Sequence, residues 1–269
     1  MMNFEALTQK LAKLNHYRPL NAIELKALNE NIKVEHIWSS NAIEGNTLTL
    51  NETRLVLENG LTVSGKPLKN YLEVLDLSAA YDYVGSLASK KQKLESKDIR
   101  DINRLVTLKT SEESSLAGAF RKVDAYPNGF PDEKYNSPFF ISEDVEDFII
   151  WYNAENHLHP VEKAAQTHLK LVSIHPFADG NGRTSRLFMN FALMTAGYPI
   201  INIQPDQESR TAYISALREL RNDNHPEKFT ALVADYVDKT LDFMLKTLEL
   251  AEKNQSDFEK YKATSELPE

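Results

Sequence analysis

The sequence contains no cysteine, and that absence removes a whole set of chemistries. Disulfides, thiolate nucleophiles and thiolate metal sites all need cysteine sulfur, so none of them can hold this fold or carry its reaction. Long apolar runs are absent too, since no window approaches the roughly 20 apolar residues that cross a bilayer. The start of the chain, MMNFEALTQKLAKLN, is amphipathic and lacks the apolar stretch of a signal peptide. We therefore expect a cytoplasmic protein that has no membrane partner.

Basic residues are in the minority, with 31 Lys and Arg against 39 Asp and Glu, which gives a formal net charge of −8. A negative charge is the wrong sign for neutralising a phosphate backbone, so we expect no nucleic-acid partner. The rest of the composition, 42% apolar and 26% charged residues, is ordinary for a globular protein. A chain of 269 residues is long enough for one large domain or two small ones.

Apolar residues recur mainly at helical spacing, and alternating strand-like runs are short and few. The predicted fold class is therefore mainly α. Thr49 followed by Glu52 has the form of a capping box, which predicts a helix over residues 52–59 that ends at Gly60. Further along the chain, Ser142 is predicted to cap another helix.

Two more helices are predicted around a short connection in the second half of the chain. Pro160 suits the first turn of a helix that runs to about His175, where Pro176 stops it. A second helix is predicted to begin near Arg183 and to continue to Gly197. The connection between these helices carries the strongest chemical signal in the sequence.

That signal is the stretch HPFADGNGRTSR, residues 175–186. Gly180 and Gly182 let the backbone approach a ligand closely, and N–H groups here join the positive end of the following helix. Arg183 adds a permanently charged fork for the same anion. Asp179 supplies the hard carboxylate oxygen that Mg²⁺ prefers. The stretch therefore predicts a phosphate site.

His175, at the end of the preceding helix, is the candidate general base. Its unperturbed pKa of about 6.5 lets it accept the proton of an attacking hydroxyl at neutral pH. Phe177 is expected to point into the core and to pin the loop. Together these residues predict a phosphoryl-type transfer, in which positioning and charge stabilisation do most of the work.

The same stretch resembles the signature of the Fic family, His-x-Phe-x-Asp/Glu-Gly-Asn-Gly-Arg-x-x-Arg, at every fixed position. The resemblance implies a Fic-type helical bundle that transfers AMP from ATP to a Ser, Thr or Tyr hydroxyl of a protein, with the chain itself among the candidate targets. It also implies roles for particular residues, with His175 as catalytic base, Asp179 as Mg²⁺ ligand, and Gly180, Asn181, Gly182, Arg183 and Arg186 as phosphate-binding residues.

Looser likenesses to the family concern three other features. Residues 118–138 are rich in glycine, proline and aromatics, which predicts a loop or short hairpin. Within this segment, Gly118–Phe130 resembles the family's flap, which implies a short β-hairpin near the active site. Tyr213 lies where family members often place an aromatic near the adenine. The related Doc branch commonly has lysine in place of Gly182, so the glycine favours AMP transfer over phosphorylation.

A second motif, residues 40–45 with the sequence SNAIEG, resembles the family's inhibitory pattern, Ser/Thr-x-x-x-Glu-Gly/Asn. Ser40, Glu44 and Gly45 occupy its fixed positions. The resemblance implies that Glu44 pairs with Arg186 and keeps the γ-phosphate from binding productively. A carboxylate on that arginine removes a charge-assisted contact and adds repulsion against phosphate.

These likenesses divide the chain into three predicted parts. Residues 1–90 form an N-terminal helical region that contains the inhibitory motif, residues 91–245 form the Fic catalytic core, and residues 246–269 form a helix end and polar tail. Family members often dimerise, so a homodimer is one of the oligomeric states we consider.

Two alternatives to an autoinhibited AMP transferase stay open at this point. The same site could serve a hydrolase that removes AMP from modified proteins, with Glu44 aligning the water. The chain could also be a helical binding protein whose contacts are regulated by a nucleotide. Neither the protein target nor the choice of ATP over another nucleotide can be read from the sequence.

Overall fold

A computed structural model describes residues 4–17, 22–90, 92–127, 130–155, 157–223 and 225–265. Within these residues the secondary structure is helical, which confirms the predicted fold class. The helices are α1 (Phe4–His16), α2 (Ala22–Ile43), α3 (Leu50–Asn59), α4 (Leu68–Lys90), α5 (Ser96–Thr107), the 3-10 turn η1 (Pro138–Phe140), α6 (Ile141–Asn153), α7 (Pro160–Ile174), α8 (Asn181–Thr195), α9 (Gln207–Asp223) and α10 (Glu227–Ser265).

The sequence located the ends of some helices well and of others less well. Thr49 and Glu52 form the predicted capping box at the start of α3, and Gly60 ends that helix in the left-handed region with φ 64°. The prediction for Ser142 was wrong. α6 already begins at Ile141, and it is preceded by a 3-10 turn that Ser137 caps by accepting from the N–H of Phe139.

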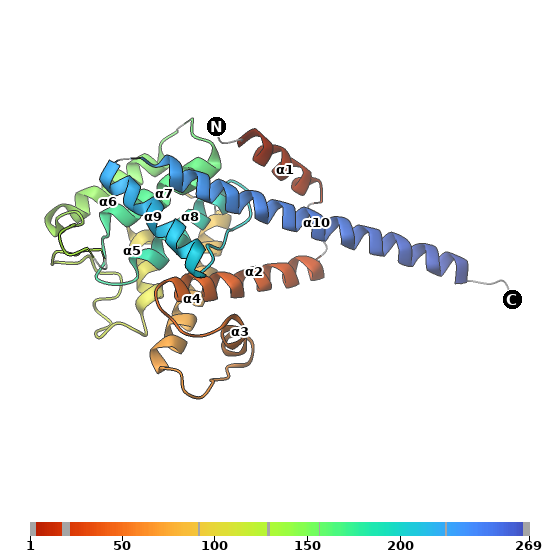
Figure 1. Cartoon of the computed structure of the whole chain (residues 1–269), viewed down its shortest axis with the longest axis horizontal. Helices are drawn as coiled ribbons and strands as arrows, with labels where there is room; N and C mark the ends of the chain where they lie inside the picture. The colour runs from red at the N-terminus through yellow and green to blue at the C-terminus, as the bar shows by residue number, and fades with distance from the viewer. Residues whose placement is uncertain are drawn as a thin grey trace.

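Helices α7 and α8 form the centre of the molecule and lie side by side (Figure 1). α8 also packs on α4 and α5, and α7 packs on α6 and α10. Because α8 is surrounded in this way, nearly its whole length is buried, including the large side chains Phe188 and Phe191. The loop between α7 and α8 is therefore anchored at both ends in the best-packed part of the fold.

The two ends of the chain flank this centre. α10 extends away from the rest of the molecule toward the C-terminus, and α1 packs against it (Figure 1). The predicted boundary near residue 246 falls inside α10, whereas the boundary near residue 90 falls where α4 ends. α2 contacts α3, α4 and α8, which brings the predicted inhibitory motif to the central helix pair.

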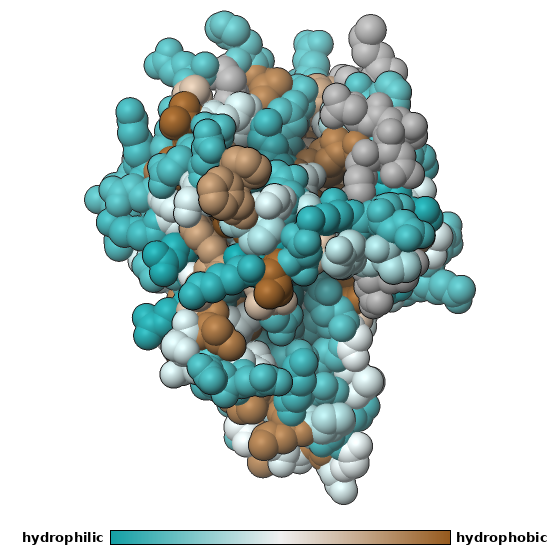
Figure 2. Space-filling view, turned by 90° about the vertical axis from the view of Figure 1, so that its left-hand side faces the viewer, coloured by the Kyte–Doolittle hydropathy of each residue, from teal (hydrophilic) through white to brown (hydrophobic). Residues whose placement is uncertain are grey.

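None of the helices that the structure describes is both long and apolar enough to span a membrane. The face that includes α6 and the flap carries scattered apolar residues among hydrophilic ones (Figure 2).

The described part of residues 118–138, which we call the flap below and which includes the segment Gly118–Phe130 that resembles the family's flap, is an irregular loop, and the predicted β-hairpin is not confirmed. In the described part of residues 118–138 the pairing is limited to one isolated bridge, between Phe120 and Phe177, and one bond from the N–H of Tyr135 to the carbonyl of Ala125. Other backbone groups of this segment bond to side chains and to the α7–α8 loop, and no continuous ladder forms in its described residues.

Candidate active site

The loop from His175 to Gly180 turns the chain sharply between α7 and α8. His175 ends α7 in the left-handed region, with φ 50° and ψ 58°, and its N–H still donates to the carbonyl of Leu171 at 3.1 Å. Among the residues that the structure describes, His175 is the one non-glycine residue with positive φ. Such a conformation costs of order 1–3 kcal/mol and persists where the surroundings impose it. The backbone that carries the imidazole is thereby held in one conformation at the point where α7 meets the loop.

Asn181 holds the shape of this loop through its side chain. Its Oδ1 accepts from the N–H of Phe177 at 3.0 Å, and its Nδ2 donates to the carbonyl of Phe177 at 2.7 Å. Phe177 is buried, as predicted. The amide of Asn181 is therefore occupied within the loop, and the groups that this position offers to an anion are backbone N–H groups of the first turn of α8.

A buried asparagine of α5 joins three parts of the site, and no sequence motif pointed to it. Asn103 donates from Nδ2 to the carbonyl of Asp179 at 3.0 Å and to Oγ1 of Thr184 at 3.2 Å, while its Oδ1 accepts from the N–H of Gly118 at 3.2 Å. It also approaches Gly180, where an added Cβ would lie 3.0 Å from Nδ2 of Asn103. A glycine is needed there both for this close approach and for its φ of 77°.

The flap contacts the same loop from its other side. Arg121 donates from its backbone N–H to the carbonyl of Pro176 at 2.9 Å and from Nε to the carbonyl of His175 at 2.7 Å. The Tyr135 ring stacks on the His175 ring, with centroids 3.8 Å apart. The half-buried imidazole is therefore held between its own loop and an aromatic ring of the flap.

Asp179 is exposed, with a side-chain exposure of 58%. Its Oδ1 accepts from the N–H of Gly180 at 2.6 Å and lies 3.4 Å from Nη2 of Arg183. The described residues contain no cluster of three or more His, Asp or Glu side chains that could hold a metal by themselves. A single exposed carboxylate fits the way Mg²⁺ is bound beside polyphosphates, through one or two protein carboxylates, water and the phosphates themselves.

Arg183 is buried but only partly paired, with a side-chain exposure of 3%. Its Nη1 lies 3.7 Å from Oε1 of Glu73, on α4. In the described part of the chain, its Nε and Nη1 have no hydrogen-bond partner. Since unpaired buried donors are costly, this guanidinium is suited to receiving an anion.

Arg186, one turn later, is fully paired. It donates from Nε to Oγ of Ser40 at 2.8 Å, from Nη2 to the carbonyl of Ser40 at 2.7 Å and to Oε1 of Glu44 at 2.8 Å, and from Nη1 to the hydroxyl of Tyr213 at 3.3 Å. Burial alone would lower the pKa of Arg186, but Tyr213 and Glu44 outweigh burial and raise it. The contact between Glu44 and Arg186 that the inhibitory motif predicts is present.

Tyr213 is buried in the fold. Its hydroxyl lies 3.0 Å from Nε2 of His168 as well as 3.3 Å from Arg186. In this structure Tyr213 therefore supports Arg186 from behind, and its predicted contact with adenine stays a prediction.

Two glycines make room for Glu44. Gly45 follows it with φ 99°, a conformation that ends α2 with little strain only for glycine. Gly182 faces the carboxylate directly, since an added Cβ would lie 2.2 Å from Oε1 of Glu44. Glu44 itself is 41% exposed, so its carboxylate faces solvent as well as Arg186.

Two buried histidines lie close enough to Arg186 to respond to its charge. Burial and the charge of Arg186 lower the pKa of His36 to about 4 and that of His168 well below its usual value. Both are therefore neutral at pH 7. His168 stacks on Phe229 and contacts Tyr213, which agrees with the structural role that a lone histidine on an apolar face suggests.

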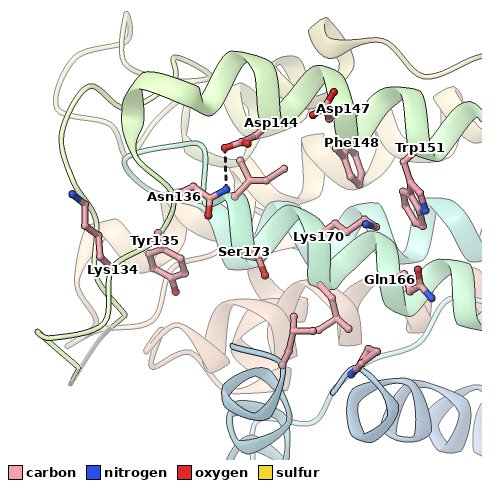
Figure 3. A pocket seen from close by; sticks show the side chains of 14 residues that line it. Lys134, Tyr135, Asn136, Asp144, Asp147, Phe148, Trp151, Gln166, Lys170 and Ser173 are labelled. Atoms are coloured by element: carbon pink, nitrogen blue, oxygen red, sulfur yellow. Dashed lines mark hydrogen bonds between the residues drawn. The ribbon is translucent and has the colours of Figure 1, made fainter. Parts of the chain in front are cut away.

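A groove of about 560 Å³ lies beside the catalytic loop (Figure 3). The flap contributes Tyr135 and Asn136, α6 contributes Asp144 and Trp151, and α7 contributes the residues that lead into His175. Nδ2 of Asn136 donates to Asp144 at 2.9 Å, which ties the flap to α6 along the wall of the groove (Figure 3). The groove meets the active site at Tyr135, because this ring also stacks on His175.

Comparison with known proteins finds Fic proteins both by sequence and by structure. The model of the Fic/DOC family matches residues 93–193. Curated proteins named protein adenylyltransferase Fic, from Culex quinquefasciatus and Aedes aegypti, are each 38% identical to this chain over 245 residues, which cover 90% of this chain and 47% of each relative. The chain thus spans about half the length of the curated relatives it matches.

Solved structures with the same fold include Fic-1 (aa134–508) from C. elegans, with a TM-score of 0.81 and 27% identity, covering 92% of this chain and 72% of that one. A Fic domain containing signaling protein from Bacteroides thetaiotaomicron has a TM-score of 0.81 and 28% identity, covering 89% of this chain and 95% of that one.

Proposed function

Because this chain belongs to the Fic/DOC family, we propose that it is a protein adenylyltransferase, which moves AMP from ATP to a hydroxyl of a protein and is restrained by Glu44. The observation that carries this proposal is the juxtaposition of His175, the glycine-rich start of α8 and two arginines around one loop. The names of the curated relatives support the reaction.

The proposed transfer forms one bond and breaks one bond at the α-phosphate. His175 accepts the proton of the target hydroxyl as its oxygen attacks the α-phosphorus. The bond from that phosphorus to the bridging oxygen of the β-phosphate breaks, and pyrophosphate leaves. N–H groups at the start of α8, together with Arg183, would stabilise the charge that develops on the phosphates. The stacked Tyr135 would keep the imidazole oriented during this step.

Asp179 is the residue that would hold Mg²⁺, since its carboxylate is exposed at the start of α8. A bound Mg²⁺ would neutralise part of the phosphate charge.

Glu44 supports the proposed restraint because it occupies the arginine that the incoming nucleotide would need. While Arg186 donates to Glu44, a γ-phosphate would compete for the same donor and would face the repulsion of the carboxylate. Release of Glu44 would leave Arg186 held by Ser40 and Tyr213 with a donor free for phosphate. The proposed restraint is therefore a competition for one guanidinium.

Labelled ATP tests the reaction without knowledge of the target. Protein carrying Glu44→Gly is incubated with a cell extract and either α-phosphate-labelled or γ-phosphate-labelled ATP, and labelled proteins are separated on a gel. The proposal predicts label on protein with α-labelled ATP only, and none in the matched Glu44→Gly/His175→Ala protein. Transfer of the γ-label would contradict it, because that outcome is phosphorylation.

A further inference from the structure

Glu73 is a buried carboxylate that neither the catalytic nor the inhibitory motif contains. It lies on α4, with a side-chain exposure of 12%. Its Oε2 accepts from Nδ2 of Asn46 at 2.8 Å, and its Oε1 lies 3.7 Å from Nη1 of Arg183 and 3.8 Å from Nζ of Lys69. A buried carboxylate is stable only when it is paired and hydrogen-bonded, and the group opposite it within the site is Arg183.

Arg183 lies between two carboxylates, and neither of them forms a short hydrogen bond with it. Asp179 approaches Nη2 at 3.4 Å and Glu73 approaches Nη1 at 3.7 Å, both longer than a strong charge-assisted hydrogen bond. Arg186, by contrast, uses all three nitrogens of its guanidinium. The surroundings of Arg183 thus fix its position by charge, with Nη1 on the side of Glu73 and Nη2 on the side of Asp179.

Glu73 is itself held from the N-terminal region. Asn46, two residues after Glu44, donates to Glu73 and to the carbonyl of Asn70 at 2.9 Å, and its Oδ1 accepts from the N–H of Leu48 at 3.0 Å. Because Asn46 is tied at three points, the Glu73 carboxylate has little freedom to turn. A fixed carboxylate can orient a neighbouring guanidinium.

We propose that Glu73 is a positioning residue for the transfer reaction, which holds Nη1 of Arg183 so that the side of the guanidinium that carries Nη2, beside Asp179, is directed toward the phosphates. This inference rests on the proposed function of the site. Glu73 does not touch the nucleotide, and it acts through Arg183. Asn46 fixes the carboxylate and so links the segment after the inhibitory glutamate to Arg183.

A carboxylate in this place has two opposing effects, which give the proposal a distinctive kinetic signature. It orients Arg183, which favours the transition state, and it partly cancels the positive charge that attracts ATP. Removing its charge should therefore lower kcat while leaving KM for Mg-ATP unchanged or lower. A residue needed only for folding would instead reduce the fraction of active protein, which lowers the apparent kcat without tightening the Kd for Mg-ATP and is accompanied by a loss of thermal stability.

The test compares Glu73→Gln with Glu73→Asp, both in the Glu44→Gly protein. Three quantities are measured for each variant: transfer kinetics over a range of Mg-ATP concentrations, the Kd for Mg-ATP by calorimetry, and the melting temperature. Glu73→Gln should lower kcat about tenfold and tighten the Kd for Mg-ATP about twofold to fivefold, with a melting temperature close to that of the parent. Glu73→Asp keeps the charge and should recover part of kcat. Asp82→Asn, an exposed change on the same helix, is the matched control and should equal the parent.

Two results would overturn the proposal. One is a Glu73→Gln protein with the kcat and Kd of the parent, and the other is a Kd that weakens in step with a lower melting temperature. If the Glu44→Gly parent transfers no AMP, the proposed function fails, and the Kd values for Mg-ATP still decide whether Glu73 tunes Arg183.

Discussion

The His175 loop and the helix α8 that follows it are contacted on two sides, and each contact depends on one buried arginine. On the α2 side, Arg186 donates to Ser40 and to the carboxylate of Glu44. On the flap side, Arg121 donates to backbone carbonyls, those of His175, Val123 and Asn136. Arg186 thus has a charged and half-exposed partner, Glu44, whereas the partners of Arg121 are neutral carbonyls of the main chain.

This difference separates a contact that a ligand can replace from one that it cannot. A phosphate can compete with Glu44 for Arg186, because both are anions that accept from the same donor. Nothing in the proposed reaction competes with the main-chain carbonyls that hold Arg121. Burial accordingly lowers the pKa of Arg121, only partly offset by Asp124, whereas Tyr213 and Glu44 raise that of Arg186. We infer that the flap contact is structural and that the α2 contact is the regulated one.

Removing the flap contact should have the largest effect. Arg121→Met leaves buried carbonyls without donors, so we expect the free energy of unfolding to fall by about 2–4 kcal/mol and transfer by the Glu44→Gly protein to fall by at least about 100-fold. Chemical denaturation and label incorporation measure the two effects. Arg54→Met, which breaks an exposed pair on α3, is the control and should change neither quantity. A stable and active Arg121→Met protein would remove the distinction between the two sides.

Removing the α2 contact should change activity in the opposite direction. Glu44→Gly frees Arg186, and we expect transfer to rise by about tenfold to a hundredfold, the usual range for coupling between two sites. Because the carboxylate is 41% exposed, the cost in stability should stay below about 1 kcal/mol. Glu44→Gln keeps the size of the side chain and removes its charge, so it should lie between native and Glu44→Gly. Equal rates in all three proteins would contradict the proposed restraint.

A smaller effect is expected from a substitution that crowds the carboxylate of Glu44. In Gly182→Ala, the new Cβ would lie 2.2 Å from Oε1 of Glu44, and the flexible carboxylate is the group that must move. Loss of an exposed ion pair of this kind predicts that Mg-ATP binds about threefold to fivefold more tightly, measured by calorimetry. In the Glu44→Gly protein, which lacks that carboxylate, the same substitution should not tighten binding, because only the 3.1 Å approach of the new Cβ to Nη1 of Arg186 remains. Weaker binding in that background would mean that the methyl group damages the phosphate site itself.

Lowering the pH should gradually reduce the free energy of unfolding, because two buried histidines become protonated. A buried histidine whose folded pKa is lowered stabilises the fold above its unfolded pKa near 6.5, and this contribution is lost as the pH falls toward the folded value. For His36 the window runs from about pH 6.5 to about 4, and His168 adds to it. Urea titrations should therefore show a loss of up to about 1.4 kcal/mol per pH unit for each histidine. His225→Gln, at an exposed position, should leave the slope unchanged.

Local chemistry explains which parts of the site were predictable from sequence. The α7–α8 loop, the capping box of α3 and the pairing of Glu44 with Arg186 depend on short motifs whose residue types are each required by one physical need. Position 180, for example, requires glycine because its φ is positive and because Asn103 approaches it closely. These features were present in the structure where the motifs placed them.

The remaining parts depend on contacts between distant segments, which no local pattern records. Asn103 and Glu73 are ordinary polar residues of helical stretches, and their roles appear only when α4 and α5 pack against α8. The turn residues of the flap predicted a loop or short hairpin, and the resemblance to the family's flap implied the hairpin. The backbone of the flap instead bonds to side chains and to the catalytic loop, so tertiary contacts decide its form.

We have proposed that the His175 loop carries a transfer of AMP and that Glu44 holds this reaction back. The most direct measurement is the intact mass of native, Glu44→Gly and Glu44→Gly/His175→Ala proteins after incubation with Mg-ATP and a protein substrate found by labelling. We expect the substrate to gain the mass of one AMP quickly with Glu44→Gly, slowly with the native protein and not at all with the double variant. An AMP adduct that forms equally fast with all three proteins would contradict the account.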